Sequence, residues 1–304
     1  MKILIAEDNA VSRRVVETQL TTWGHEVLSA NNGIEAWEIL QANDAPPLAI
    51  LDWMMPGIDG VELCRRVRER TNQLYTYIIL LTGKDRKEDV VKAMDAGADD
   101  YVIKPPDHSE LQVRIRAGCR VIELEQRLIE TQEKLKVQAT HDSLTGLWNR
   151  SAIFDILDRE LGRAKRNETP ISIGMADLDH FKSVNDSFGH IAGDTVLREV
   201  ANRMRSVTRD YDSIGRYGGE EFLIVFPGLD EKDAIDAAER IRLSISEKPF
   251  VIQEGVVPVA ISIGVAVMNP TTKAGQAESL IRLADEALYT AKAQGRNRVE
   301  LKKE

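Results

Sequence analysis

Continuous apolar runs, each bounded by polar or charged residues, alternate with helix-like segments over roughly the first 120 residues. The runs are KILIAED, LAILDWMMP, YIILLTG and DDYVIKPP. Between them lie segments with helical periodicity, such as RRVVETQLTTWG and KEDVVKAMDAGA, which end at Gly24 and Gly97. A strand without polar alternation is buried on both faces, which is typical of a parallel sheet covered by helices on both sides. We therefore expect a doubly wound α/β domain at the amino terminus.

Length and charge balance narrow the class of protein. A chain of 304 residues is long enough for about two domains. Its 43% hydrophobic and 29% charged residues are ordinary for a soluble globular protein, and no apolar run approaches the roughly 20 residues of a membrane span. The net charge of -9 disfavours nucleic acid and anionic membranes as partners. Two cysteines, Cys64 and Cys119, and an amino terminus without a signal-peptide pattern predict a cytoplasmic protein.

Residues 109–140 contain no strand signal and no proline. Apolar residues recur there at heptad spacing: Ala117, Val121, Leu124, Leu128 and Leu135. Such a seam, flanked by Glu, Lys and Arg, is typical of a coiled coil. We expect a helical stalk that continues the last helix of the first domain and pairs with a second copy of the chain. The alternative is a single amphipathic helix packed on its own domain.

The pattern changes after THDSLTGLWNR. An apolar strand, PISIGMADLD, is followed by a helix and then by IGRYGGEEFLIVF, in which two apolar arms flank a glycine pair. That arrangement predicts a β-hairpin. A further strand-like run, VAISIGVAV, lies between two more helices. We expect an α+β domain over residues 141–304, with antiparallel hairpins and with helices on one face of its sheet.

Polar groups cluster at the predicted carboxyl ends of the amino-terminal strands, where parallel sheets bind their ligands. Glu7 and Asp8 follow the first strand, and Asp52 follows another. Adjoining carboxylates repel one another unless a hard cation such as Mg²⁺ joins them. Lys104 and Thr82, also at strand ends, are suited to hold an added phosphate by charge and by a hydrogen bond. Each acid alone is more simply a solvated loop residue, but the group together predicts a metal and phosphate site.

A second acidic group is predicted in the carboxy-terminal domain. Asp177 ends a strand that we expect beside the hairpin carrying Glu220 and Glu221. Removing bare carboxylates from water is costly, so acids at the edge of a core favour a bound cation. Gly218 and Gly219 leave room for a phosphate or a base to approach the backbone. A solvated hairpin tip is the alternative to this Mg²⁺ and triphosphate site.

Cations and amide groups accompany these acids along the chain. Lys182, Lys292 and Arg296 are suited to phosphate oxygens, although each of the last two alone fits a solvated helix end better. Asn185 and Asp194 offer acceptor and donor groups suited to the edge of a guanine. The pattern therefore favours a nucleoside triphosphate as the ligand.

The motifs AEDN, LDWMMPGIDG, LLTG and YVIKP resemble those of response-regulator receiver domains over residues 1–122. The resemblance implies a five-stranded, flavodoxin-like domain in which Asp52 accepts a phosphoryl group from a histidine kinase. It also implies one Mg²⁺, held by Glu7, Asp8, Asp52 and the carbonyl of Met54.

The same resemblance implies roles for the surrounding residues. Lys104 would hold the phosphoryl oxygens. Thr82 and Tyr101 would form a switch, in which the hydroxyl moves toward the phosphate and the ring turns inward behind it. The bond before Pro105 is usually cis in this family. Pro106 departs from the family pattern, in which a larger apolar residue is common, and would stiffen the loop that enters the stalk.

The motifs DSLTGLWNR, DLDHFKSVND, FGHIAGD, RYGGEEF, SIGVA and ADEALYTAKAQGRN resemble those of the GGDEF domain of diguanylate cyclases, here in the GGEEF form. This resemblance covers the expected second domain and implies a cyclase-like palm fold. Two GTP molecules would condense to cyclic di-GMP with release of two pyrophosphates. Each domain would supply half of an active site, so two copies would face each other in a homodimer formed through the stalk and the receiver domains.

The GGDEF resemblance also implies a role for each site residue. Two Mg²⁺ per catalytic site would share four ligands: Asp177, the Leu178 carbonyl, Glu220 and Glu221. Glu220 would serve as a metal ligand, as the base that helps to deprotonate the attacking 3'-hydroxyl, or as both. The other residues would contact the nucleotide at its phosphates or at its guanine: Lys182, Lys292, Arg296, Asn185, Asp194 and His190.

The tetrapeptide RDYD shortly precedes GGEEF. Its Arg209 and Asp212 resemble the RxxD site through which the product inhibits members of this family. Arg163 and Arg240 are either helpers from other surfaces or solvated side chains. The sequence therefore predicts a phosphorylation-activated diguanylate cyclase with product inhibition. The alternatives are a catalytically inactive receptor for cyclic di-GMP and a phosphorelay adaptor whose second domain only dimerises.

Overall fold

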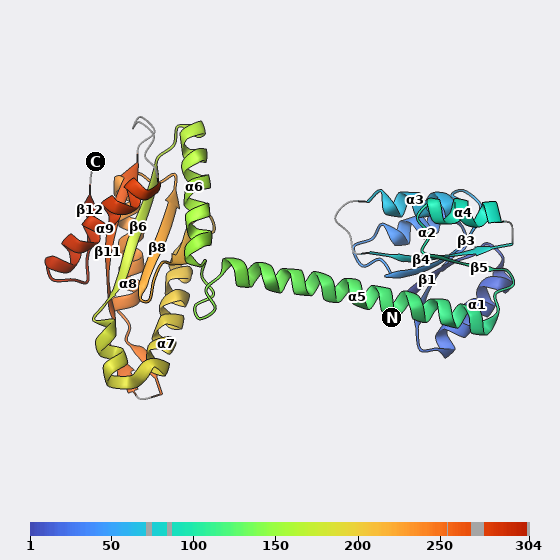
Figure 1. The fold of residues 1–304 in the computed structure, drawn as a ribbon, viewed down its shortest axis with the longest axis horizontal. Helices are drawn as coiled ribbons and strands as arrows, with labels where there is room; N and C mark the ends of the chain where they lie inside the picture. Colours follow the sequence, from blue (N-terminus) through green and yellow to red (C-terminus); the bar gives the residue numbers. More distant parts are fainter. Residues whose placement is uncertain (71–74, 84–86, 254, 269–276, 303–304) are drawn as a thin grey trace. The chain divides into compact units, whose positions relative to one another are not determined.

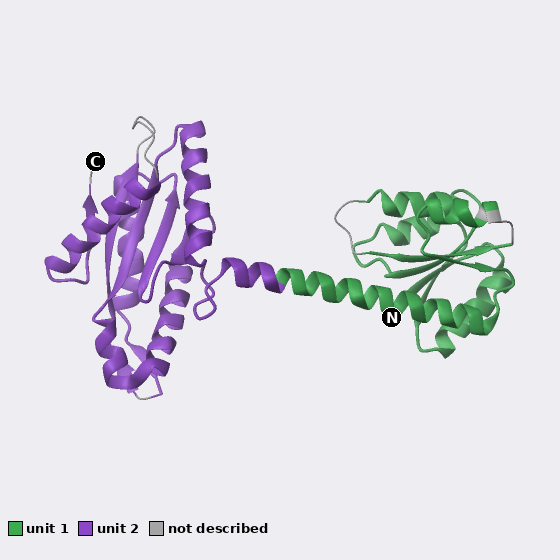
Figure 2. Ribbon diagram, viewed as in Figure 1, with its two compact units in different colours: residues 1–133 green, residues 134–304 purple. Residues whose placement is uncertain are grey.

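The computed structural model of the chain describes residues 1–70, 75–83, 87–253, 255–268 and 277–302. The chain divides into two compact units, residues 1–133 and residues 134–304 (Figure 2). Each unit has its own sheet and its own apolar core. The described helices include none that combines the length and hydropathy needed to cross a membrane.

The first unit is built on a parallel sheet with strand order β2-β1-β3-β4-β5 (Figure 1). Its strands are β1 (Lys2–Ala6), β2 (Glu26–Ala30), β3 (Leu48–Asp52), β4 (Tyr77–Thr82) and β5 (Asp100–Ile103). The central strands β3 and β4 are buried at every position, as their continuous apolar sequences predict. β2 is a half-exposed edge strand, which explains why its sequence EVLSA has no continuous apolar run.

Helices cover both faces of this sheet, and the expected doubly wound fold is confirmed. They are α1 (Ala10–Thr22), α2 (Gly33–Leu40), α3 (Gly60–Arg68), α4 (Lys87–Asp95) and α5 (His108–Thr140). One apolar cluster joins α1 and α5 to the sheet, and another joins α2, α3 and α4 to the opposite face. This order brings the carboxyl ends of β1, β3 and β4 to the same edge.

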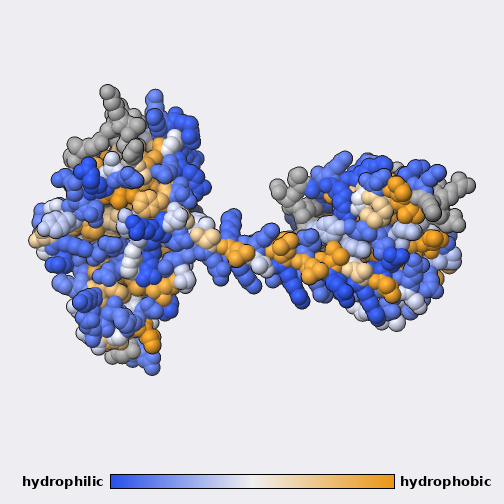
Figure 3. Space-filling view, viewed as in Figure 1, coloured by the Kyte–Doolittle hydropathy of each residue, from blue (hydrophilic) through white to orange (hydrophobic). Residues whose placement is uncertain are grey.

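Helix α5 runs for 33 residues and belongs to both units. Leu111, Ile115 and Ile122 in its first half are buried in the core of the first unit. The heptad seam lies at other positions and is exposed: Leu124 is 58% exposed and Leu135 is 58% exposed. Figure 3 shows apolar side chains along this helix. The alternative of packing on its own domain therefore describes only the first half of α5, and the exposed seam is available for a partner.

The second unit contains an antiparallel sheet of order β12-β11-β6-β8-β7, in which only the β11–β12 pair is parallel. These strands are β6 (Ile171–Asp179), β7 (Ser213–Arg216), β8 (Glu221–Pro227), β11 (Ala260–Met268) and β12 (Val299–Lys302). A separate ribbon pairs β9 (Phe250–Ile252) with β10 (Gly255–Val257).

The expectation that helices cover one face of this sheet was wrong. Its helices are α6 (Arg150–Asn167), α7 (Phe181–Val207), α8 (Glu231–Ser246) and α9 (Ala277–Ala293). Helices α6 and α9 pack on one face, while α7 and α8 pack on the other. The physical reason is that β6 and most of β8 and β11 are buried on both faces, so each face needs a cover. Helix α7 is interrupted at Gly189, where φ is 83°.

Candidate functional site

Three carboxylates meet at the carboxyl edge of the first sheet. Glu7 and Asp8 follow β1, and Asp52 ends β3; one ligand atom of each lies within 4.8 Å of the others. Glu7 and Asp52 are buried, whereas Asp8 is exposed. A group of oxygen donors open to solvent on one side fits Mg²⁺, which binds a few carboxylates and keeps several waters. The amide of Met54 donates to Oδ1 of Asp52 over 3.3 Å, while metal binding by its carbonyl stays a prediction.

Lys104 joins two of these acids. Its Nζ lies 2.5 Å from Oε2 of Glu7 and 2.7 Å from Oδ2 of Asp52. Burial alone would lower the pKa of Lys104, but its contacts with Asp52 and Glu7 raise it overall. Burial raises the pKa of Glu7, Lys104 offsets part of that effect, and the charge of Asp52 raises the pKa again. The Lys104–Pro105 peptide bond is cis, as the receiver resemblance implies.

The two proposed switch residues lie on neighbouring strands. Thr82 ends β4 and is buried, and its carbonyl accepts a hydrogen bond of 2.7 Å from the amide of Lys104. Tyr101 on β5 lies opposite Leu80 on β4, and its half-buried ring packs against the apolar cluster beneath α2, α3 and α4. Thr82 is thereby tied to the acidic site through Lys104, while Tyr101 lies on the neighbouring strand; their role as a switch stays a prediction.

In the second unit, residues 217–220 connect β7 to β8, as the GGEEF motif predicts. Asp177 on β6 lies directly opposite Glu221 on β8. A Cβ at Gly218 would come within 2.8 Å of Oε2 of Glu221, so glycine there lets the carboxylate fold back over the turn. Gly219 has open space around it, which leaves its backbone accessible.

A lysine lies among these acids. Nζ of Lys292, in the last turn of α9, is 2.9 Å from Oδ1 of Asp177. Burial raises the pKa of Asp177, and Lys292 offsets part of that effect. Burial also raises the pKa of Glu220, and the nearby charge of Asp177 raises it further. Within the described chain no second carboxylate group is as tight as the one in the receiver, so Asp177, Glu220 and Glu221 are less closely gathered.

The remaining predicted residues surround the hairpin less directly. The amide of Leu178 donates to the carbonyl of Glu220 over 3.3 Å, which ties β6 to the turn. Oδ1 of Asn185 lies over Gly193, where a Cβ would come within 2.0 Å of it, so the two parts of α7 approach each other across the break at Gly189. Asp194 directly follows Gly193. Lys182 and His190 are exposed. Arg296 has a left-handed backbone, and its charge helps to lower the pKa of Asp177 against the effect of burial.

Two residues that the sequence reasoning missed hold the hairpin in place. Nε and Nη2 of Arg216 donate to the carbonyl of Gly219 over 3.0 and 2.7 Å, and its Nη1 lies 3.2 Å from both oxygens of Asp142. Asp142 also accepts from the amide and the hydroxyl of Thr145. The chain just after the stalk is thereby tied to the acidic turn. Asp142 and Arg216 are the first residues of the motifs DSLTGLWNR and RYGGEEF, but nothing in either motif indicates that the two side chains pair.

A third missed residue, Asp179, organises the loop that carries Arg296. Its Oδ1 accepts from the hydroxyl of Ser262 over 2.8 Å, and its Oδ2 accepts from the amide of Asn297 over 2.9 Å. Asp179 is buried at the end of β6. The second aspartate of the DLDHFK motif therefore has its oxygens occupied by the protein, while the first, Asp177, faces Lys292.

We predict that Asp142→Asn destabilises the second unit at neutral pH. Burial alone would raise the pKa of Asp142, but hydrogen bonds from Thr145 and contacts with Arg216 lower it overall. A carboxyl whose folded pKa is lowered stabilises the fold above its unfolded pKa of about 3.9, and this contribution is lost as the pH falls through the folded pKa. The expected loss at pH 7 is about 1.5–3 kcal/mol. Thermal unfolding at neutral and acid pH measures this loss of stability, with Asp155→Asn, at an exposed position, as the control. If Asp142→Asn is less stable than the parent by the same amount at both pH values, the assignment is contradicted.

The RDYD segment forms a tight turn. The amide of Arg209 donates to Oδ2 of Asp212, and the amide of Asp212 donates to the carbonyl of Arg209, both over 3.0 Å. Burial raises the pKa of Asp212, while Arg209 and Arg240 oppose this rise. Arg240 is therefore close to the turn. Arg163 lines a cavity of about 340 Å³ together with Tyr211 of the same segment, so both candidate helpers lie near RDYD within one domain.

Comparison with known proteins agrees with this geometry. The family model described as diguanylate cyclase, GGDEF domain, matches residues 139–298. The chain belongs to the GGDEF diguanylate cyclase family. A second model, response regulator receiver domain, matches residues 3–116. This GGDEF protein therefore carries a receiver domain ahead of its cyclase-type domain.

Several relatives are similar to this GGDEF protein. The response regulator PleD of Caulobacter vibrioides is 33% identical over 300 residues, which cover 98% of this chain and 65% of PleD. Diguanylate cyclase DosC of Escherichia coli is 39% identical over 192 residues, 63% of this chain and 40% of DosC. The chain thus spans less than two thirds of the length of either relative. The solved coiled coil and GGDEF domain of DgcB from Caulobacter crescentus, in complex with c-di-GMP, is 34% identical with a TM-score of 0.56, covering 63% of this chain and 98% of that one.

Proposed function

We propose that this protein is a diguanylate cyclase that condenses two GTP into cyclic di-GMP and is activated by phosphorylation of Asp52. The observation that carries the proposal is the GGEEF turn, where Glu220 and Glu221 lie beside Asp177 and a lysine. Burial and mutual repulsion leave these acids in need of a cation, which is what a metal-bound triphosphate supplies. Intact acids at all three positions disfavour a purely receptor or adaptor role.

In the proposed reaction, the 3'-hydroxyl of one GTP attacks the α-phosphorus of the other, and the bond to the β-phosphate breaks with release of pyrophosphate. A second, symmetric attack closes the ring. Mg²⁺ held by Asp177, the Leu178 carbonyl, Glu220 and Glu221 would clamp the phosphates and acidify the hydroxyl. Glu220, in the turn between β7 and β8, is suited to take the proton of that hydroxyl. Lys292 pairs with Asp177 and is positioned to bind a phosphate oxygen in its place when GTP binds.

The full chain incubated with GTP and Mg²⁺, followed by chromatography of the nucleotides, tests this activity. Cyclic di-GMP and pyrophosphate in a ratio of one to two support the proposal. An inactive receptor would bind cyclic di-GMP without forming it, and an adaptor would neither bind nor form it. Transfer of phosphate from a histidine kinase to Asp52 would separately identify the receiver's partner class.

Pairing of two chains through the α5 seam is the proposed route from receiver to catalysis. The exposed leucines of α5 supply the apolar contact, and phosphorylation would shift the population toward a dimer whose half-sites face each other. A tenfold rise in activity requires a shift of only about 1.4 kcal/mol.

We predict that the phase of the seam matters more than its length. Deleting residues 124–130 removes one heptad and keeps the seam in register, whereas deleting residues 124–127 rotates the downstream seam by roughly 50°. The seven-residue deletion should therefore retain more phosphorylation-stimulated activity. Activity assays at matched dimer fraction, checked by sedimentation, compare the two. Equal stimulation of both variants would mean that α5 is a passive tether.

Product inhibition at RDYD is the second proposed control. We predict that Arg209→Ala weakens cyclic di-GMP binding by roughly tenfold or more, because each lost charge-assisted hydrogen bond costs about 1.5–3 kcal/mol. The turn lies apart from the acids, so the initial rate should be unchanged and inhibition of the parent should be noncompetitive with GTP. Progress curves with added product and calorimetric titration measure both effects. Inhibition of the variant at the parent's product concentration would show that RDYD is only a surface turn.

A further inference from the structure

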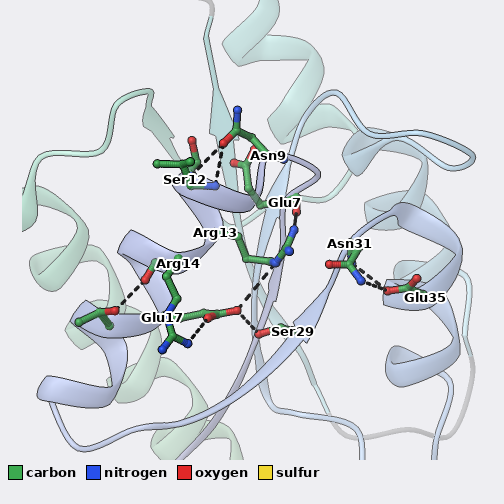
Figure 4. A network of polar contacts seen from close by, with 11 residues as sticks. Glu7, Asn9, Ser12, Arg13, Arg14, Glu17, Ser29, Asn31 and Glu35 are labelled. Atoms are coloured by element: carbon green, nitrogen blue, oxygen red, sulfur yellow. Dashed lines mark hydrogen bonds and ion pairs between the residues drawn. The ribbon is translucent and has the colours of Figure 1, made fainter.

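A polar network behind the receiver acids joins β1, α1 and β2 (Figure 4). Nη1 of Arg13 donates to the backbone carbonyl of Glu7 over 2.6 Å, and its Nε lies 3.8 Å from Oε1 of Glu17. The hydroxyl of Ser29 donates to the same Glu17 oxygen over 2.5 Å. The side chain of Arg13 is only 17% exposed, whereas that of its neighbour Arg14, which also contacts Glu17, is 81% exposed.

The network holds one residue of the metal site, Glu7, from several directions. The amide of Glu7 donates to the carbonyl of Ala30 over 3.2 Å, and its carbonyl accepts from Arg13. Its carboxylate accepts from the amide of Asn9 over 3.3 Å and contacts Lys104. The backbone of Glu7 is therefore fixed before any cation binds, and Arg13 is the side chain from α1 that fixes it.

We propose that Arg13 is a positioning residue for the Mg²⁺ site of the receiver. Glu7, Asp8 and Asp52 repel one another at their short separations, and Asp52 is held in a central strand, so the segment after β1 is the part that can yield. Arg13 resists that movement through the Glu7 carbonyl. Glu17 neutralises the guanidinium, so the network holds the acids without adding net positive charge beside the cation. Outer-shell groups of this kind typically contribute 10–100-fold to metal affinity.

Mg²⁺ titration of the full chain tests this inference without any enzymatic step. Trp53 follows Asp52 directly, and the fluorescence change that Trp53→Phe abolishes reports the receiver site alone. Arg13→Lys keeps the charge but loses the planar fork, so its Mg²⁺ dissociation constant should rise about tenfold. Arg14→Lys is the matched control and should stay within about twofold of the parent, because Arg14 shares Glu17 but does not contact Glu7.

A purely structural role for Arg13 would lower the melting temperature and leave the Mg²⁺ dissociation constant of the folded variant unchanged, which would overturn the proposal. If Arg13→Lys does not fold, Glu17→Gln provides the test, because it removes the anion beside Nε but keeps the bond to Glu7. Glu17→Gln should also raise the Mg²⁺ dissociation constant, by a smaller factor than Arg13→Lys. An unchanged dissociation constant would again overturn the proposal. The inference rests on the proposed receiver function. If the parent chain shows no fluorescence response to Mg²⁺, both the receiver function and the role of Arg13 are contradicted. If the parent responds and Arg13→Lys binds Mg²⁺ equally well, only the role of Arg13 is contradicted.

Discussion

Glu220→Gln is expected to reduce cyclic di-GMP formation by about a hundredfold or more while the fold is retained. The substitution keeps the size of the side chain but removes a negative charge from the turn where Asp177 and Glu221 gather. A general base contributes typically 10²–10⁴ to the rate, and loss of a metal ligand adds to that effect. The measurement is product chromatography with saturating GTP and Mg²⁺.

Glu278→Gln is a suitable control, because Glu278 is exposed in the first turn of α9 and lies outside the hairpin. It should keep the parent rate. Glu278→Gln should melt at the parent temperature, and Glu220→Gln at that temperature or slightly above it, since burial works against the charge of Glu220. Substantial turnover by folded Glu220→Gln would show that Glu220 is not required for the reaction, and Asp177 and Glu221 would then be the candidate acids.

Asp52→Asn is expected to abolish the response to phosphodonors. Asp52 is the acid of the receiver group that ends a central strand, and an amide cannot form the acyl phosphate. Lys104, 2.7 Å from Oδ2, is placed to neutralise the added phosphoryl oxygens. The ratio of activity with and without a small-molecule phosphodonor should fall to about one in the variant if the whole regulatory effect passes through this site.

Asp44→Asn provides the matched control, because the Asp44 side chain is 83% exposed and pairs with Lys2 at the surface. It should respond to phosphodonor as the parent does. Phosphorylation is followed directly by mobility on a phosphate-binding gel, so a lost response is separated from a lost modification. Stimulation of Asp52→Asn equal to that of the parent would place the switch elsewhere in the chain.

Some features follow from sequence alone because they depend on local pattern. The apolar runs around Leu48–Asp52 and Tyr77–Thr82 have no polar alternation, and only a strand buried on both faces tolerates that composition. Asp52 and Thr82, which end these runs, had to fall at the same sheet edge as Glu7 and Asp8 once the strands were parallel. Likewise the glycine pair between apolar arms predicted the hairpin that carries Glu220.

Other features were decided only by tertiary structure. Arg216 and Asp142 are 74 residues apart, and Asn297 and Asp179 are 118 apart, so no local pattern pairs them. Arg13 and Arg14 are adjacent and chemically identical, yet one is held against the Glu7 carbonyl and the other is solvated. The sequence by itself determined the buried strands, the main helices and the acidic turns, because periodicity and composition record whether each face is buried; a half-exposed edge strand such as β2 leaves no such record. The fold decided which charges meet, since a side-chain pair depends on how distant segments pack, and adjacent residues on a helix point in different directions.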